Sequence, residues 1–407
     1  MSDGTLVVGA GQAGAQLVAS LRDAGETAPI VLIGAEPDPP YQRPPLSKGY
    51  LAGDVDADRL MLRAPAFYRD RDVELVVDER ITGLGRTTAT TGRGRELTFD
   101  RLALTVGARP RRLDVPGSDL EGVHVLRDRA DADGLRDALG RARRVVVIGG
   151  GFVGLEAAAG AGGLDRSVTV VECAERLMGR AVAPMISRFY RDAHERRGAR
   201  VLLGAGVVAL DGEHGRVRVV HLADGTDIAA DLVLVGIGAA PRTELAEQLG
   251  ISCRGGVPVD RDARTAIDGV VAAGDCTMQP HPTVPAAAPR RVESVQNAVY
   301  QAKVAAAALT GGPRPAPEVP WFWSDQADLK LQIAGLSVEP DEIVVRGDPG
   351  TERFAALHYR DGALLAVDAV NSPADYLVVR RALAGGINLP ADVVRRSDRP
   401  LKELLTA

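Results

Sequence analysis

Two glycine-rich motifs of the same kind stand far apart in this chain, Gly9-Ala10-Gly11-Gln12-Ala13-Gly14 and Gly149-Gly150-Gly151-Phe152-Val153-Gly154. In this spacing the first glycine permits a tight turn, the second lets the backbone approach a pyrophosphate, and the third lets a helix pack closely on a strand. The phosphates then lie at the positive N-terminal end of that helix. The motifs predict two dinucleotide sites, one containing Gly9, Gly11 and Gly14 and the other containing Gly149, Gly151 and Gly154.

A carboxylate follows each motif at the distance where a ribose is bound. Glu36 and Glu172 each come about 20 residues after their motif. A carboxylate accepts hydrogen bonds from ribose hydroxyls and repels a 2′-phosphate, so Glu172 favours NADH over NADPH at the second site. Arg176 and Arg180 follow within a few residues, and either they hold a phosphate or they are solvated surface residues.

Short apolar runs position both motifs. Residues 5–8 and 145–148 precede the glycines, and residues 30–33 and 168–171 lead to the two acids. Leu17 and Leu21 are four apart after the first motif, which is typical of one face of a helix. After the second motif an alanine-rich helix starts at Leu155, and we expect it to end near Gly160 because Gly162 and Gly163 disfavour helix. The pattern predicts an α/β fold.

The order of these segments indicates three domains. Another buried strand, residues 270–276, carries Gly274-Asp275 and returns the chain to the first nucleotide-binding domain. We expect a discontinuous first nucleotide-binding domain of residues 1–109 and 239–319, a second nucleotide-binding domain of residues 110–238, and a C-terminal α+β domain of residues 320–407. The run of residues 232–238 is expected to end at Pro241, and the last domain is expected to hold strands at 342–346 and 364–367 and a helix over 374–384.

Composition narrows the function classes. The 407-residue chain has a net charge of −5, which gives no reason to expect nucleic acid. Cys173, Cys253 and Cys276 are not spaced for a disulfide framework or a metal site, so we expect no metal. These cysteines best fit a reducing cytoplasm, so we expect a cytoplasmic protein. We also expect it to be soluble and unprocessed, because no apolar run approaches the roughly 20 residues of a membrane helix and no basic-then-apolar leader precedes the first strand.

Three further motifs make the chain similar to a known family. They are residues 41–48 (YQRPPLSK), 291–298 (RVESVQNA) and 321–326 (WFWSDQ). Together with the glycine motifs and Gly274-Asp275, the sequence resembles the FAD-dependent ferredoxin reductases of bacterial oxygenase systems, a group that includes the putidaredoxin and rubredoxin reductases. The resemblance covers the whole chain. It implies two Rossmann-like, glutathione-reductase-like nucleotide-binding domains and a C-terminal α+β domain.

The resemblance also implies roles for individual residues. By it, Lys48 lies beside the isoalloxazine ring, Glu156 lies near the nicotinamide, and Trp323 lies near the flavin on the ferredoxin side. The residues that match FAD-binding positions are Ala13, Glu36, Arg43, Pro45, Lys48, Ile81, Arg127, Gly274, Asp275 and Val295. Those expected at the pyridine nucleotide are Glu172, Arg180 and Gly238.

In the reaction that the resemblance implies, the bound cofactor carries out the chemistry. NADH delivers a hydride to FAD, and the reduced flavin gives two electrons singly to a [2Fe-2S] ferredoxin that feeds a cytochrome P450 or a Rieske dioxygenase. A cation such as Lys48 favours the electron-rich reduced flavin, although a lysine after a Pro-rich turn is also an ordinary surface residue. Arg290, Arg291 and Lys330 are either docking residues for an acidic ferredoxin or scattered solubilising charges. Likewise Trp323 is either on the electron exit route or a core aromatic.

Other functions remain open at this point. A rubredoxin reductase or an NADH oxidase fits the same motifs. A flavin disulfide reductase needs a redox cysteine on the segment that here carries residues 43–48, and this segment has none. A redox-sensing flavoprotein similar to apoptosis-inducing factor would keep both nucleotide sites, since fold alone does not decide function.

Overall fold

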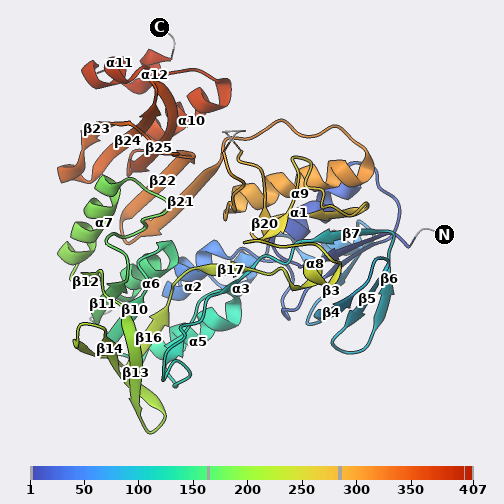
Figure 1. The fold of residues 1–407 in the computed structure, drawn as a ribbon, viewed down its shortest axis with the longest axis horizontal. Coiled ribbons are helices and arrows are strands. Elements are labelled where there is room, and N and C mark those ends of the chain that lie inside the picture. Colours follow the sequence, from blue (N-terminus) through green and yellow to red (C-terminus); the bar gives the residue numbers. More distant parts are fainter. Residues whose placement is uncertain (1–2, 163–165, 283–286, 398, 406–407) are drawn as a thin grey trace. The chain divides into compact units, whose positions relative to one another are not determined.

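The computed structural model describes residues 3–162, 166–282, 287–397 and 399–405 (Figure 1). The chain forms two compact units, each assembled from three separate segments. The first unit consists of Met1–Gln42, Ala57–Arg109 and Ala240–Pro320. The second unit consists of Arg43–Asp56, Pro110–Ala239 and Trp321–Ala407.

A parallel sheet is the centre of the first unit. Its strands are β1 (Thr5–Val8), β2 (Ile30–Ile33), β3 (Val73–Val76), β7 (Arg101–Leu104) and β19 (Val270–Ala272). They run in the order β19-β7-β1-β2-β3, with Val8 in register with Ile33 and with Leu104. Because the carboxyl ends of parallel strands share one edge, the first glycine motif, the segment leading to Glu36 and the Gly274-Asp275 turn all follow that edge.

Two long helices cover this sheet. Helices α1 (Gln12–Asp23) and α9 (Val295–Thr310) lie side by side (Figure 1). Leu17 and Leu21 are fully buried and share a hydrophobic cluster with Ala302, which confirms the predicted face of α1. The smaller elements of this unit are β4 (Ile81–Leu84), β5 (Thr88–Thr91), β6 (Glu96–Thr98), α3 (Ala57–Leu60), α4 (Pro65–Arg69), α8 (Glu244–Gln248), β18 (Val257–Pro258) and β20 (Thr277–Met278).

The second unit repeats the parallel arrangement. Its strands are β9 (Val123–His124), β10 (Arg144–Ile148), β11 (Ser167–Glu172), β12 (Arg200–Leu203) and β16 (Leu232–Val235), in the order β12-β11-β10-β16-β9. Its other elements are η1 (Pro44–Ser47), α2 (Gly49–Ala52), α5 (Arg129–Leu139), α6 (Phe152–Gly162), α7 (Pro184–Arg196) and the antiparallel strands β13 (Val207–Glu213), β14 (Arg216–Leu222) and β15 (Asp227–Ala229). The helix expected to end near Gly160 continues to Gly162, while Gly163 lies outside the described residues.

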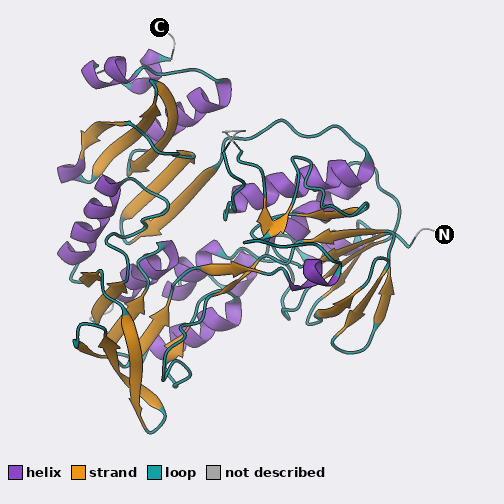
Figure 2. Cartoon of the chain, in the orientation of Figure 1, coloured by secondary structure: helices purple, strands orange, loops and turns teal. Residues whose placement is uncertain are grey.

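The second unit also holds an antiparallel sheet, visible in Figure 2 as a set of strands flanked by helices. Its strands are β21 (Trp321–Gln326), β22 (Leu329–Gly335), β23 (Glu342–Asp348), β24 (Arg353–Arg360) and β25 (Ala363–Val370), in the order β21-β22-β25-β24-β23. The accompanying helices are η2 (Pro349–Thr351), α10 (Pro373–Gly385), α11 (Ala391–Arg396) and α12 (Leu401–Leu404). The Phe354 ring packs 4.9 Å from Phe189 of α7, so this sheet shares a core with the second parallel sheet.

The predicted α/β class with a C-terminal α+β region is confirmed, including the strands near 342 and 364 and the helix near 374. One boundary differs: β16 ends at Val235, and Pro241 closes a separate short strand, β17 (Ala239–Pro241), beside β8 (Ala108–Pro110). A proline at the end of a strand does not have to donate a backbone hydrogen bond to the neighbouring strand, which explains why Pro241 can be the last residue of β17. Among the described residues no helix is both long and apolar enough to cross a membrane.

Candidate functional site

The first glycine loop has the geometry that its spacing predicts. Gly9 has φ of +113°, and a Cβ there would lie 2.3 Å from the Thr105 carbonyl oxygen. A Cβ on Gly14 would lie 2.1 Å from the Gly9 carbonyl oxygen, so the strand and helix approach too closely for a side chain. Gly11 is different, since a Cβ there meets nothing within 4 Å. Two glycines are thus needed by the fold, whereas Gly11 borders open space.

This open space lies at a helix end with unsatisfied donors. Gly11 is the N-cap of α1, and it provides no side-chain hydrogen bond to the first turn, which also carries no acid. The first N–H groups of a helix have no partner within the helix and attract a phosphate. The loop therefore fits the pyrophosphate of a dinucleotide.

Glu36 lies beyond the end of β2 at the same sheet edge. The Gly9 N–H donates to the Ile33 carbonyl at 2.8 Å, and a Cβ on Gly34 would collide with Ala10. The Tyr41 hydroxyl donates to the Glu36 carboxylate, which orients it. Tyr41 belongs to the motif of residues 41–48, but its contact with Glu36 was not predicted, because a spacing of five residues in a loop has no periodic signal.

The Gly274-Asp275 turn packs against both long helices. A Cβ on Gly274, whose φ is +86°, would lie 3.3 Å from the Ala13 Cβ and 3.7 Å from the Ala298 Cβ. Val295 is the first residue of α9, next to the N-cap Ser294, whose hydroxyl accepts from Asn297 N–H at 3.0 Å. The structure thus places Ala13, Gly274 and Ala298 together, with Asp275 on the adjoining turn and Val295 in the turn of α9 that precedes Ala298.

Buried amides that were not predicted hold this turn in place. Gln301 Oε1 accepts from Gly274 N–H at 2.8 Å and from the Thr277 hydroxyl at 3.0 Å. Gln301 Nε2 donates to Gln279 Oε1 at 2.6 Å, and Gln279 Nε2 donates to Asn297 at 2.9 Å. The only available signal was the four-residue spacing of Asn297 and Gln301 on one helix face.

Other residues of the first unit lie elsewhere. Ile81 is 5% exposed within the hydrophobic cluster around β1 and β7. Glu293 precedes the N-cap of α9, and its carboxylate lies 3.0 Å from Arg291 Nε. Arg290 exchanges backbone hydrogen bonds with Gln279 and is partly buried.

The second glycine loop repeats the geometry of the first. Gly149 has φ of +110°, and its Cβ would lie 2.4 Å from the Gly236 carbonyl oxygen. A Cβ on Gly154 would lie 2.3 Å from the Gly149 carbonyl oxygen, whereas one on Gly151 would meet its nearest atom at 3.9 Å. This loop also fits a dinucleotide.

The Glu172 carboxylate is fixed beside this loop. Its Oε2 accepts from Gly150 N–H at 2.6 Å, and its Oε1 accepts from Ala174 N–H at 2.8 Å. Oε1 also accepts a weak hydrogen bond from the Cys173 thiol at 3.4 Å, and Oε2 retains a lone pair for a ribose hydroxyl. The two backbone bonds orient the side chain before any nucleotide binds.

The two arginines after Glu172 have different environments. Arg176 donates to the carbonyls of Val182 and Gly179 and to the Ser187 hydroxyl, so it stabilises the turn before α7 and is not a solvated surface residue. Arg180 is exposed, and its Nη2 lies 3.4 Å from the position of a Cβ on Gly238. The structure therefore brings Arg180 and Gly238 together, whereas Arg176 is held by its hydrogen bonds to the turn before α7.

Lys48 and Glu156 form an ion pair. Lys48 Nζ lies 2.7 Å from Glu156 Oε2, with 16% and 3% of the side chains exposed. Ser47 also donates to Oε2, and Ser324 of β21 donates to Oε1 at 2.6 Å. Lys48 follows η1, and its ammonium also donates to the Pro44 carbonyl at 3.2 Å. A buried charge requires such partners.

The remaining predicted residues of this unit lie around the Pro-rich turn and β21. Arg43 donates to the Arg127 carbonyl at 2.8 Å, and Pro45 lies within η1. The ring of Trp323 lies 5.5 Å from that of Trp321, and Phe322 packs 4.6 Å from Phe152. Both tryptophans are only partly buried, so this cluster is not a closed core.

The cysteines are not arranged for thiol chemistry. All three are free, and burial raises the pKa of the Cys276 thiol to about 12. Burial likewise raises the pKa of Cys173 and that of Cys253. Since the thiolate is the reactive form, these residues do not support a disulfide reductase.

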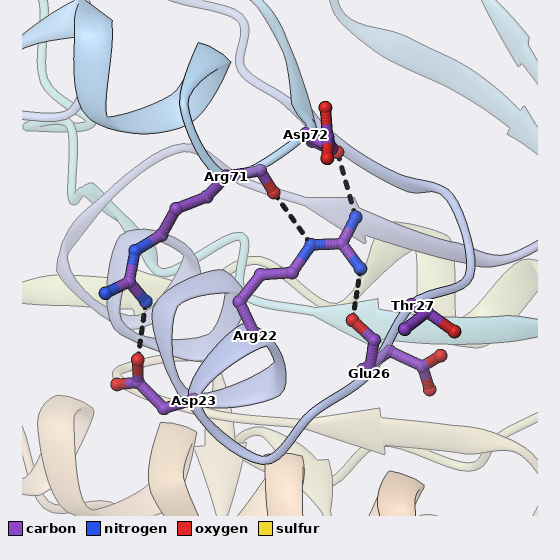
Figure 3. Close-up of a pocket in the computed structure, with 6 residues that line it drawn as sticks. All are labelled: Arg22, Asp23, Glu26, Thr27, Arg71 and Asp72. Atoms are coloured by element: carbon purple, nitrogen blue, oxygen red, sulfur yellow. Dashed lines mark hydrogen bonds and ion pairs between the residues drawn. The ribbon is translucent and has the colours of Figure 1, made fainter.

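A pocket of about 380 Å³ lies at the other end of α1 from the glycine loop (Figure 3). Arg22, at its centre, donates to the backbone carbonyls of Glu26, Ala28, Arg71 and Asp72. Arg71 pairs with Asp23. Arg22 and Arg71 therefore join α1 to the segment before β3.

Known proteins resemble this chain over its whole length. Residues 4–302 match the family described as pyridine nucleotide-disulphide oxidoreductase, and residues 321–405 match the reductase C-terminal family. The ferredoxin reductase subunit of 5,5′-dehydrodivanillate O-demethylase from Sphingobium sp. is 42% identical over 99% of this chain and 98% of its own.

Two solved structures are similar throughout. A ferredoxin reductase from Rhodopseudomonas palustris gives a TM-score of 0.94 at 38% identity, covering 99% of each chain. The putidaredoxin reductase of a covalent complex with putidaredoxin gives 0.95 at 34% identity, covering 99% of this chain and 98% of that one.

Proposed function

Because the chain belongs to the pyridine nucleotide-disulphide oxidoreductase family, and within it to the ferredoxin reductases, we propose that it transfers electrons from NADH through FAD to a [2Fe-2S] ferredoxin. The bound FAD accepts a hydride and releases electrons one at a time. The observation that carries the proposal is the pair of glycine loops whose second glycines, Gly11 and Gly151, border open space in a chain that matches ferredoxin reductases over its length.

In this proposal the first unit holds FAD. Gly11 and the free N–H groups of α1 bind the pyrophosphate, and Glu36, oriented by Tyr41, binds the adenosine ribose. Asp275 and Val295, on the turn and helix end packed against Ala13, bind the remainder of the cofactor. Arg43, Pro45, Ile81 and Arg127 complete the FAD contacts in the proposal.

The second unit holds NADH in the same way. Gly151 lies at the pyrophosphate, and Glu172, with both oxygens oriented by backbone N–H groups, binds the ribose and disfavours a 2′-phosphate. Arg180 and Gly238 lie close enough to each other to contact the same part of the nucleotide.

Lys48 and Glu156 serve the hydride-transfer step. Lys48 provides a cation that favours the electron-rich reduced state, and Glu156 orients the ammonium through the 2.7 Å ion pair. Trp323 serves the exit of electrons toward the ferredoxin. The partly exposed rings of Trp321 and Trp323 support this role.

The acceptor is an acidic ferredoxin that in turn feeds a cytochrome P450 or a Rieske dioxygenase. Of the expected docking residues, Lys330 is 58% exposed, with its ammonium 3.9 Å from Asp325, whereas Arg291 is 17% exposed and lies 3.0 Å from Glu293, so exposure favours Lys330. A cytoplasmic location is part of the proposal, and it fits a protein whose three cysteines are free thiols.

The test uses the purified flavoprotein in an anaerobic stopped-flow instrument. Mixing with NADH bleaches the flavin, and a [2Fe-2S] ferredoxin then restores its colour while a small disulfide does not. Reoxidation by rubredoxin alone would assign a rubredoxin reductase. Bleaching without any protein acceptor would instead indicate an NADH oxidase or a redox sensor and refute the proposal.

A further inference from the structure

The Lys48–Glu156 pair is one end of a longer buried chain of polar side chains. Ser324 of β21 donates to Glu156 Oε1 at 2.6 Å and accepts from Gln326 Nε2 at 3.2 Å. Gln326 Oε1 lies 2.8 Å from His194 Nε2, in the last turn of α7. Ser324 is fully buried, and Gln326 and His194 are 1% and 5% exposed.

All the donors in this chain point toward the carboxylate. Burial lowers the pKa of His194, so its ring is neutral at pH 7 and Nε2 carries the proton donated to Gln326. The Gln326 amide N–H then donates to Ser324, and the Ser324 hydroxyl donates to Glu156. Hydrogen bonds aligned head to tail strengthen one another in a low-dielectric interior.

Glu156 is therefore held from two sides. Lys48 and Ser47, around the Pro-rich turn, engage Oε2, while Ser324 alone among the described side chains engages Oε1. The 2.6 Å distance is typical of a charge-assisted O–H to carboxylate bond. Without the Ser324 hydroxyl, Oε1 is buried with no donor, and the carboxylate is free to rotate toward Lys48.

We propose that Ser324 is a positioning residue for hydride transfer, since it fixes the Glu156 carboxylate from the strand that also carries Trp323. This inference rests on the proposed function. The adjacent residues Trp323 and Ser324 point to opposite faces of β21, so one strand serves the electron exit and the hydride-transfer step. The Ser324 hydroxyl dipole also offsets part of the Glu156 charge beside Lys48.

The experiment compares wild-type flavoprotein with Ser324→Ala and Ser324→Cys. Alanine leaves Oε1 without a donor, and cysteine replaces the hydroxyl with a somewhat larger thiol that is only a weak donor. We expect the limiting rate of flavin bleaching at saturating NADH to fall about tenfold in both variants, as for loss of a buried hydrogen bond to a charged group. The Kd for NADH changes little, because the nucleotide is bound mainly at Glu172 and the second glycine loop.

A second readout does not depend on turnover. The equilibrium midpoint potential of the bound flavin should become more negative in both variants, because the negative charge of Glu156 is less neutralised. Ser372→Ala is the matched control: it removes a serine hydroxyl that donates to the Asp375 carboxylate at 2.9 Å in the same C-terminal sheet region. This control should leave the rate and the potential unchanged.

The outcomes separate this inference from the proposed function. If wild-type protein reduces the ferredoxin but both Ser324 variants keep its bleaching rate and midpoint potential, the positioning role is refuted while the function stands. Equal effects in Ser372→Ala would refute it as well, because they would reflect general destabilisation. If wild-type protein is bleached by NADH but passes no electrons to a ferredoxin, the proposed function fails, and the Ser324 effects on bleaching still test the positioning role.

Discussion

Three glycines with identical chemistry have three different uses in each nucleotide loop. Gly9 and Gly149 adopt positive φ, Gly14 and Gly154 allow backbone contact, and the second glycine of each motif has room for a side chain. The sequence spacing predicted these uses, but only the atoms around each Cβ position separate a glycine needed for folding from one needed for a ligand.

The first prediction follows from this difference. Gly11→Ala should leave the melting temperature of the FAD-free protein unchanged but abolish retention of FAD, because the methyl occupies the space of a phosphate. Gly14→Ala should fold poorly, since its Cβ would lie 2.1 Å from a carbonyl oxygen. Absorbance of bound flavin and thermal unfolding measure both effects. Gly134→Ala, in an open position of α5, is the control and should retain FAD fully.

The second prediction concerns nucleotide choice. Glu172→Ala removes the carboxylate that is oriented by Gly150 and Ala174, so the preference for NADH over NADPH should narrow by about tenfold or more. The measurement is the ratio of kcat/KM for the two nucleotides. An unchanged ratio would show that another residue selects the nucleotide.

At the scale of elements, α7 and β21 are joined by buried polar side chains. His194 of α7 bonds to Gln326, and its own charge is disfavoured first by burial and further by Arg197, although the bond to Gln326 opposes this. The folded protein therefore holds His194 neutral at a pH where the unfolded chain, with a pKa near 6.5, takes up a proton.

The third prediction is the resulting pH dependence. As pH falls through about 6.5, the unfolded state binds a proton that folded His194 does not, so the free energy of unfolding decreases. His194→Gln keeps an N–H donor but removes the titration, and its melting temperature should fall less than that of the wild type between pH 7.5 and pH 5.5. Parallel curves for the two proteins would contradict this. Burial also lowers the pKa values of His124 and His281. Both residues are present in the wild type and in the variant, so their contributions to the pH dependence cancel in the comparison.

At the scale of the whole molecule, two half-reactions share one chain. The second unit contains the second glycine loop, the Lys48–Glu156 pair and the aromatic strand β21, although these come from three separate segments of the sequence. The reaction with NADH and the reaction with the ferredoxin are therefore expected to depend on different residues of the same unit.

The fourth prediction tests this division. Trp323→Ala should slow ferredoxin reduction while flavin bleaching by NADH stays largely intact, because the ring is partly exposed and its aromatic neighbours within the described residues are Trp321 and Phe322. Stopped-flow measurement of each half-reaction separates the two. Phe67→Ala, an aromatic change in the first unit, is the control for lost packing alone. Equal loss in both half-reactions would give Trp323 a structural role.

The sequence alone determined both glycine loops, the acids after them and the alternation of strands and helices, because these depend on local spacing and short-range periodicity. It also identified Lys48 and Glu156 separately through the family resemblance. Only the tertiary structure joined these two and added Ser47, Ser324, Gln326 and His194, which lie up to 279 residues from one another and follow no common period. Hydrogen bonds between distant segments are set by how the sheets pack, and no local pattern in the chain encodes them.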